Sequence, residues 1–469
     1  MKTRTLARSA GLASQPTLQR QSDFRRHPLA AASTAAFAVA LHTVPASASV
    51  CLTANTDTTV SANTTSCVSW STTGNASLTV TNTGVLSGST TGVAASGSGT
   101  GAVLSNSGVI SGTTNGVVDT GTIGTLSNQA GGTIAGSSNY AIYVDFGTVG
   151  SLINQGGGSI NGALIGVADA GTITSLTNGG LISGNWGVAV GGAGQIGTLT
   201  NSGTITGTGS GYGIYNLSGT IGTLLNEANG LISGGGYGVD NNASIGTLTN
   251  DGTITGGIDG VLSSTGTIGT ITNSGTIHGN QNGLAGSNLT ITNNGTISGG
   301  IDAIDFTGGT SLLTLASGQV MSGAIELGSG ARATIGATGT GLTLSNAIKL
   351  DSSNSALTLN STGNLTVSGA ISGSGSVTAA GTGTLTLSGA NTYTGNTTIS
   401  SGTLQLSGDP SQTTGNIANG GALIFARSAN SSYGGTISGN GSVTQAGTGT
   451  LTLTGAHTYT GATAINTGA

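Results

Sequence analysis

Charged and aromatic side chains are scarce in this sequence. Asp, Glu, Lys and Arg make up 5% of the 469 residues, and Phe, Trp and Tyr make up 3%, whereas an ordinary globular protein has about 25% charged residues. An ordinary enzyme core needs large side chains to fill it, so this composition excludes one. Disorder is excluded as well, because disordered chains are poor in apolar residues and 35% of these residues are hydrophobic.

Basic side chains are almost absent after the first 26 residues. Nine Lys and Arg residues stand against 14 Asp and Glu, and only Arg332, Lys349 and Arg427 of the nine lie beyond Arg26. Binding to nucleic acid needs a basic surface that meets the phosphates. The chain beyond Arg26 has no such surface, which excludes a nucleic-acid partner.

The N-terminal residues have the pattern of a secretory signal. Arg25 and Arg26 precede a short apolar stretch, Leu29–Leu41, and a small-residue site, Ala46–Ala48, follows it. This order of basic, apolar and cleavage regions predicts a signal peptide over residues 1–48 and export of the remainder.

The sequence has only two cysteines. Cys51 and Cys67 follow the predicted cleavage site, and an exported chain meets an oxidising compartment. We therefore predict a Cys51–Cys67 disulfide within an N-terminal cap over residues 49–80. Lipid modification of Cys51 is the alternative, but Val50 stands where that signal has a small residue.

Glycine is abundant, at 89 residues, and much of it lies in a short internal repeat. The segment Gly194–Gly207 (GQIGTLTNSGTITG) returns at Ile245–Gly256 and at Ile268–Gly279. Each copy has two alternating runs around an Asn-x-Gly corner, and a third run such as Tyr237–Asp240 follows. Alternation indicates strands, and Gly and Asn suit tight corners. Three strands in about 23 residues predict one turn of a right-handed parallel β-solenoid, an all-β fold, over residues 81–310.

One Asn anchors each predicted turn. Each Asn either occupies a corner, with positive φ or a bond to neighbouring backbone, and stacks as an amide ladder, or contributes to a polar binding strip. The corner and ladder interpretation is favoured because Asn is a common corner residue. The anchors are Asn82, Asn106, Asn128, Asn154, Asn178, Asn201, Asn226, Asn250, Asn273 and Asn293.

Paired threonines recur in the same repeat. If they point outward and in register, they form a flat surface of hydroxyl and methyl groups suited to carbohydrate or even ice. Solvated strand threonine without a ligand is the favoured alternative. The pairs are Thr198/Thr200, Thr247/Thr249, Thr270/Thr272 and Thr290/Thr292.

A second, longer repeat fills the C-terminal part. Gly383–Gly395 (GTLTLSGANTYTG) returns as Gly449–Gly461, with His457 in place of Asn391. This motif resembles the autotransporter-associated β-strand repeat, which belongs to passenger domains of type V secreted proteins in Gram-negative bacteria. The resemblance covers residues 311–469.

The resemblance implies secretion or display at the cell surface and outer membrane of a Gram-negative bacterium, with an outer-membrane translocator barrel as partner. The second copy stops at Ala469, where the first continues to Leu404–Leu406, and no strands of barrel type follow. The chain is therefore expected to be a fragment or a truncated product that lacks its barrel.

No arrangement of side chains in the sequence predicts catalysis. His278 and His457 lie in different repeats, and Asp302 and Asp305 form the closest acidic pair, but residues three apart on a strand point to opposite faces. Gly235–Asp240 matches the start of a calcium-binding nonapeptide, and the next residues do not continue it. We therefore predict no catalytic residue, cofactor or metal.

The sequence thus predicts a non-enzymatic autotransporter passenger that acts as an adhesin or a structural surface rod. A host-surface or glycan ligand and self-association of the low-charge turns are the interactions that this role implies. One alternative is a carbohydrate-active enzyme, a polysaccharide lyase or glycosidase, on the same scaffold. The other is a transport-only remnant whose functional segment lies elsewhere.

Overall fold

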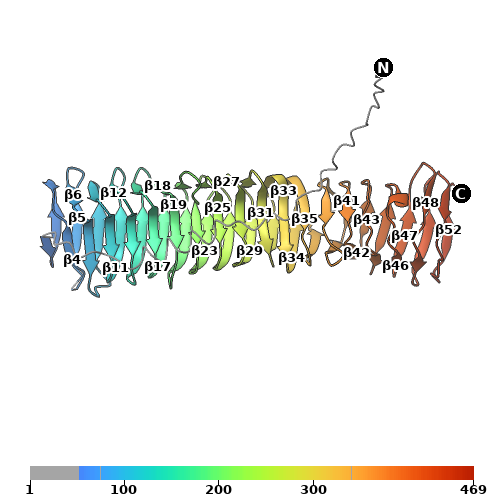
Figure 1. Cartoon of the computed structure of the whole chain (residues 1–469), viewed down its shortest axis with the longest axis horizontal. Coiled ribbons are helices and arrows are strands. Elements are labelled where there is room, and N and C mark those ends of the chain that lie inside the picture. Colours follow the sequence, from blue (N-terminus) through green and yellow to red (C-terminus); the bar gives the residue numbers. More distant parts are fainter. Residues whose placement is uncertain (1–51, 74, 340, 469) are drawn as a thin grey trace, which may run out of the picture. The chain divides into compact units, whose positions relative to one another are not determined.

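A computed structural model describes residues 52–73, 75–339 and 341–468, which wind into a parallel β-solenoid of about 18 turns (Figure 1). Successive turns lie about 23 residues apart. Each strand pairs with the strands of the turns before and after it, so the strands form ladders along the solenoid axis.

One ladder continues through all of these turns and is named ladder I. Every pairing in it is parallel. Its strands are β2 (Thr58–Val60), β5 (Ser77–Val80), β8 (Val103–Asn106), β11 (Thr122–Asn128), β14 (Thr148–Asn154), β17 (Thr172–Asn178), β20 (Gln195–Asn201), β23 (Thr220–Asn226), β26 (Ser244–Asn250), β29 (Thr267–Asn273), β32 (Thr290–Asn293), β34 (Thr310–Leu315), β36 (Arg332–Ala337), β39 (Ala356–Ser361), β42 (Ser376–Ala380), β44 (Thr397–Ile399), β46 (Ile417–Asn419) and β49 (Ile437–Ser438).

The second ladder follows ladder I along each turn and is named ladder II. Its strands are β3 (Asn63–Thr64), β6 (Val85–Gly88), β9 (Val109–Gly112), β12 (Thr133–Gly136), β15 (Ser159–Gly162), β18 (Leu181–Gly184), β21 (Thr204–Gly207), β24 (Leu231–Gly234), β27 (Thr253–Gly256), β30 (Thr276–Gly279) and the first parts of β33 (Thr296–Gly308) and β35 (Val320–Leu327).

The third ladder, ladder III, completes each turn. Its strands are β1 (Leu52–Ala54), β4 (Val68–Ser71), β7 (Thr91–Ser96), β10 (Asn115–Asp119), β13 (Tyr140–Val144), β16 (Ile165–Asp169), β19 (Trp186–Val190), β22 (Ile214–Asn216), β25 (Tyr237–Asn241), β28 (Asp259–Ser263), β31 (Asn282–Ser287), the later parts of β33 and β35, β38 (Ile348–Leu350) and β41 (Ile371–Gly373).

The C-terminal turns are built differently. A further ladder begins there and a two-stranded pair accompanies it, together with a short 3-10 helix. The elements are β37 (Leu342–Leu344), β40 (Asn364–Val367), β43 (Thr384–Leu387), β45 (Thr403–Leu406), β47 (Ala422–Phe425), β50 (Ser442–Gln445), β52 (Thr463–Ile465), the pair β48 (Ser431–Tyr433) and β51 (Leu451–Leu453), and η1 (Pro410–Gln412).

The core is a set of apolar columns inside the solenoid. Leu176 of β17, Leu199 of β20 and Leu224 of β23 are in register and 0% exposed, and Ile173 and Ile196 form a parallel column beside them. Because each inward residue stacks on its equivalent one turn away, branched aliphatic side chains fill the narrow interior without help from aromatics.

The predicted parallel β-solenoid of about 23-residue turns is confirmed, and its predicted handedness stays a prediction. Cys67 is buried next to β4, whereas Cys51 and the signal peptide over residues 1–48 lie outside the described residues. The disulfide and the domain boundaries after residues 48, 80 and 310 therefore stay predictions. Within residues 52–73, 75–339 and 341–468, no helix has the length and apolar character needed to cross a membrane.

Candidate functional site

The anchor asparagines lie inside the solenoid. Asn178 donates from Nδ2 to Oδ1 of Asn201 at 2.8 Å, and Asn201 donates to Asn226 at 2.8 Å. The same bond joins every turn from Asn106 to Asn293, and each of these side chains is 0% exposed. The amide ladder is confirmed, whereas the polar binding strip is wrong because no ligand reaches a buried side chain.

The asparagine prediction was wrong at Asn82, and of its two forms, positive φ or a bond to neighbouring backbone, the backbone bond is the one present. Asn82 is exposed, and Val80 is the residue in register with Asn106. The ladder residues are also not corner residues with positive φ, which among the described non-glycine residues occurs at Asn75, Phe146 and Asn288. The spacing in the sequence indicates that the asparagines are buried: Leu199 and Asn201 are two apart on one strand, so they share the inward face.

The paired threonines form an ordered outer surface on ladder I. Thr198, Thr223, Thr247 and Thr270 stand in one column of in-register residues. A second column contains Thr200, Leu225, Thr249, Thr272 and Thr292. Three residues of the first column, at 198, 247 and 270, are exposed. We name these two columns the threonine face; they show that the pairs point outward and in register.

Both histidines of the described turns have structural partners. His278 Nδ1 lies 2.8 Å from Ser298 Oγ. His457 Nδ1 accepts a bond from Ile437 N at 3.1 Å, just as Asn391 Oδ1 accepts one from Ile371 N at 2.9 Å in the preceding copy. His457 therefore replaces Asn391 as the acceptor of this backbone bond in the repeat.

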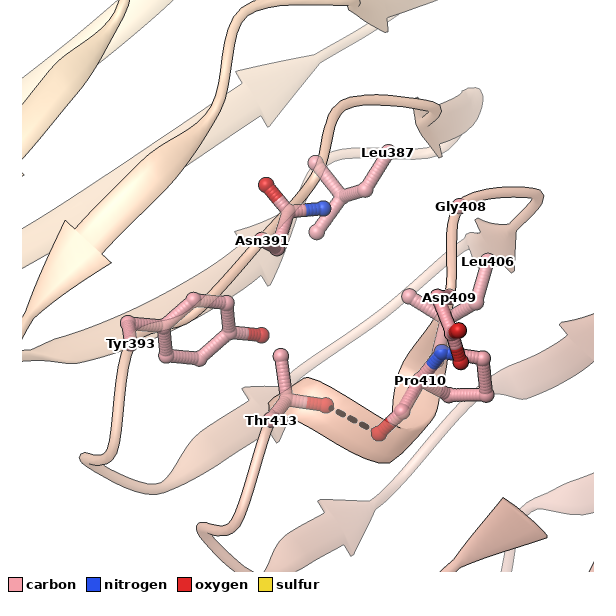
Figure 2. Close-up of a pocket in the computed structure, with 8 residues that line it drawn as sticks. All are labelled: Leu387, Asn391, Tyr393, Leu406, Gly408, Asp409, Pro410 and Thr413. Atoms are coloured by element: carbon pink, nitrogen blue, oxygen red, sulfur yellow. Dashed lines mark hydrogen bonds between the residues drawn. The ribbon is translucent and has the colours of Figure 1, made fainter. Parts of the chain in front are cut away.

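Two concavities lie in the C-terminal turns, one small and one shallow. Figure 2 shows one of about 10 Å³, enough for about one water molecule, between Tyr393 and the segment where Thr413 Oγ1 donates to the carbonyl of Pro410 at 2.9 Å. A wider, open depression of about 380 Å³ lies beside Asp409, whose carboxylate pairs with Arg427 at 2.7 Å. Neither has the enclosed shape of an ordinary substrate site.

The outer face of ladder III carries a cluster of aromatic side chains. Trp186 lies against Tyr212 and Tyr215, with ring centroids 6.0 and 5.0 Å apart, and Tyr212 continues to Tyr237 at 5.2 Å. Three of these residues, Trp186, Tyr215 and Tyr237, are at most 8% exposed. The rings therefore cover one another, and this aromatic cluster packs the outside of the turns.

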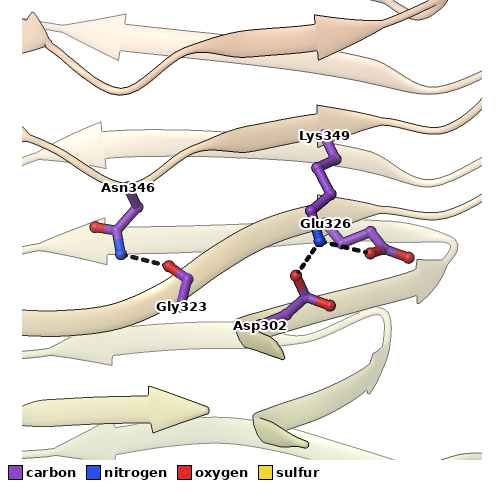
Figure 3. A network of polar contacts seen from close by, with 5 residues as sticks. All are labelled: Asp302, Gly323, Glu326, Asn346 and Lys349. Carbon is purple, nitrogen blue, oxygen red and sulfur yellow. Dashed lines mark hydrogen bonds and ion pairs between the residues drawn. The ribbon is translucent and has the colours of Figure 1, made fainter. Parts of the chain in front are cut away.

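Carboxylates follow the aromatic cluster along the same face. Lys349 Nζ binds Asp302 Oδ1 at 2.7 Å and Glu326 Oε2 at 3.3 Å, as Figure 3 shows. The three residues come from consecutive turns, on β33, β35 and β38. Burial alone would lower the pKa of Lys349, but the two carboxylates outweigh it and hold this pKa above its ordinary value.

Asp302 and Asp305 point to the same side, so the predicted opposition of this pair was wrong. Ala303 and Ile304, which lie between them, both face the interior and are 0% exposed. Two consecutive inward residues break the alternation, and the pairing of β33 shifts register at this point. A strand with such a bulge places positions three apart on one face.

The residues that match the calcium motif lie in and just before β25 of ladder III. Tyr237 and Asp240 belong to β25, and Asp240 Oδ1 accepts a bond from Asn242 Nδ2 at 3.3 Å. Burial raises the pKa of Asp240 to about 7, which disfavours a charged metal ligand. Across the described ranges, no group of three or more His, Cys, Asp or Glu is placed to hold a metal ion.

Comparison with known proteins identifies the C-terminal repeats. The family model of the passenger-associated-transport-repeat matches residues 377–406 and 443–469. No curated protein and no solved structure is similar enough to match the chain. These repeats and the β-solenoid together fit the passenger domain of an autotransporter.

Proposed function

We propose that this chain is a non-enzymatic autotransporter passenger that acts as an adhesin or a structural rod at the bacterial surface. The passenger repeat supports secretion or display through the outer membrane, with a translocator barrel as partner.

The signal peptide over residues 1–48 and the Cys51–Cys67 disulfide belong to this proposal. They predict that the exported chain begins at Ser49 and that its thiols are blocked, which intact-mass measurement tests.

The threonine face is the observation that carries the adhesive role. It presents hydroxyl and methyl groups at the regular separation of parallel strands, about 4.8 Å, over many turns of ladder I. A repeated ligand, such as a polysaccharide chain or an array of surface glycans, meets similar contacts at successive turns, with Leu225 as the exception in the second column. Weak contacts that act together give strong binding through multivalency.

Binding of the full chain to glycan arrays and to cells tests this role. The variant Thr198→Lys/Thr247→Lys places charge and bulk on two exposed positions of the threonine face, and we expect it to lose at least tenfold in binding. The matched control is Thr255→Lys on ladder II, which we expect to bind like the parent. Equal binding by both variants contradicts the adhesive use of this face, and absence of binding by every protein favours the transport-only role.

A second candidate is a carbohydrate-active enzyme. Asp302 and Asp305 lie on one face, which the alternation of the sequence did not predict, and two carboxyl groups are the usual catalytic pair of glycosidases. The ion pair of Asp302 with Lys349 argues against it. Turnover of an acidic polysaccharide that disappears in Asp305→Asn supports the enzyme, and its absence with the parent protein removes this candidate.

A further inference from the structure

Two aspartates lie inside the solenoid in a column of ladder III that is otherwise neutral. Asp119 and Asp169 are both 0% exposed, and Val144 stands in register between them. The column continues through Val190 and Asn216 in the next turns. Two carboxyl groups therefore occupy positions where neighbouring turns have valine or asparagine.

Each carboxyl group has a partner for only one oxygen. Oδ1 of Asp119 accepts a bond from Gly121 N at 3.1 Å, and Oδ1 of Asp169 accepts one from Gly171 N at 3.1 Å. Both Oδ2 atoms are buried without a hydrogen-bond partner. An unpaired carboxylate in such a place is costly, because water no longer solvates its charge.

No counter-charge offsets this cost. Ala95 of β7 and Val144 of β13 stack on Asp119, and Val144 and Val190 of β19 stack on Asp169. Asp145 is the nearest acid in the chain, but its carboxylate accepts the Tyr143 hydroxyl at 2.8 Å, away from this column. Burial is the main cause that raises the pKa of Asp119 to about 6 and that of Asp169 to about 7, and no described charged side chain contributes to either shift.

In later turns the same column position holds asparagine, whose side chain is hydrogen-bonded and uncharged. Asn216 Nδ2 donates to Asn241 Oδ1 at 2.8 Å and to the Ser244 carbonyl at 3.0 Å. Asn241 in turn donates to Ser263 Oγ at 3.2 Å. An amide has no charge at any pH, whereas aspartate is equally neutral only when it carries a proton. The interior column therefore responds to pH in the turns with aspartate and does not respond in the turns with asparagine.

We propose that Asp119 and Asp169 make the turns from residue 115 to residue 195 a proton-dependent element of the solenoid. With both carboxyl groups protonated, these turns stay closed. When a proton leaves to water, the turn opens locally so that the carboxylate is hydrated. In the turns that carry Asn216 and Asn241 this interior column has no ionisable group, so the column contributes no such loosening there.

Whether these turns gain or lose stability as pH rises follows from the raised pKa values of the two carboxyl groups. A carboxyl group whose pKa is higher in the folded state than in the unfolded state contributes its full stability below the unfolded pKa, and the contribution is lost as pH rises through the folded pKa. Opening therefore increases between acidic pH and about pH 7. Between pH 5 and pH 8 the opening equilibrium is expected to increase about tenfold at Asp119 and about a hundredfold at Asp169.

Hydrogen exchange of the full chain at pH 5 and pH 8, corrected for the intrinsic effect of pH on exchange, tests the proposal. We expect protection in β10 and β16 to fall by these factors and protection in β42 and β44, whose turns contain no Asp or Glu, to stay constant. This comparison uses the parent protein alone. Equal changes in all four strands, or none in any, overturn the proposal.

Substitution assigns the effect to the two carboxyl groups. Asp119→Asn/Asp169→Asn has the same size without the charge, and we expect it to keep its protection in β10 and β16 at pH 8. The matched control Asp145→Asn removes a carboxyl group outside the column and should leave the pH dependence unchanged. If the pH dependence persists in the double variant, or disappears in the control, the interior carboxyl groups are not its cause.

Discussion

At the residue scale, the buried asparagine is the feature that ties one turn to the next. Each ladder amide from Asn106 to Asn273 is placed so that Nδ2 donates to the amide of the following turn, and these amides also bond a nearby backbone carbonyl. The sequence predicted which residues take part because their spacing matches the turn. It did not predict Val80 at the first position, because the run around Asn82 lies out of register with the ladder.

Asn201→Ala tests the stability that one ladder member provides. The change removes one acceptor of Asn178 Nδ2, which keeps the carbonyls of Gly180 and Thr204. It leaves Oδ1 of Asn226 without its donor, and an unsatisfied buried polar group costs about 1–3 kcal/mol. We expect the free energy of unfolding in urea to fall by this amount. The control is Asn280→Ala, at an exposed position, which should change it by less than about 0.5 kcal/mol.

The carboxyl group of Asp240, on the outer face of β25, is also expected to make the stability depend on pH. Burial raises the pKa of its carboxyl group to about 7, so the stability it contributes is present at acidic pH and is lost as pH rises toward 7. We expect Asp240→Asn to recover on the order of 2 kcal/mol of the unfolding free energy at pH 8 and nothing at pH 4. Asp251→Asn, at an exposed acid, is the control and should recover nothing at either pH.

At the element scale, the bulged strands of ladder III depart most from what the sequence shows. Alternation describes ladder II and the ends of the ladder I strands, such as Leu199 and Asn201, but Ile196 and Leu199 of β20 are three apart and both face inward. In ladder III the pair Ala303 and Ile304 faces inward together, and Ala141 with Ile142 in β13 does the same. A bulge depends on how the chain leaves the preceding corner, and a two-residue period in the sequence does not record this.

Lys349 of β38 connects strands β33 and β35 to its own strand through its two ion pairs. Its removal therefore tests how much these contacts between turns stabilise ladder III. Lys349→Met leaves Asp302, 0% exposed, without its cation, and breaking a buried ion pair by removing one partner costs about 3 kcal/mol. We expect the unfolding free energy to fall by this amount. Replacing both charges, with Asp302→Asn added, should restore part of the loss, whereas Arg332→Met at an exposed position should change little.

At the scale of the whole molecule, stability is a sum of turns and of the contacts between neighbouring turns. Each strand of ladder I pairs with the strands one turn before and one turn after it. Contacts in a solenoid are local along the axis, so a defect in one turn weakens its neighbours first and reaches distant turns only through them. The repeated sequence predicted this architecture directly, because the turns over residues 81–310 follow one pattern.

Ile221→Ala in β23 tests this locality. The side chain is 0% exposed, and its truncation should cost about 2–5 kcal/mol. We expect hydrogen-exchange protection to fall strongly in β20, β23 and β26 and to change little in β8 or β42. Thr223→Ala on the outer face of the same strand is the control and should leave all five strands as they are. A uniform loss in every strand would instead mean that the solenoid opens as one cooperative unit, in which case the proton-dependent element could not loosen by itself.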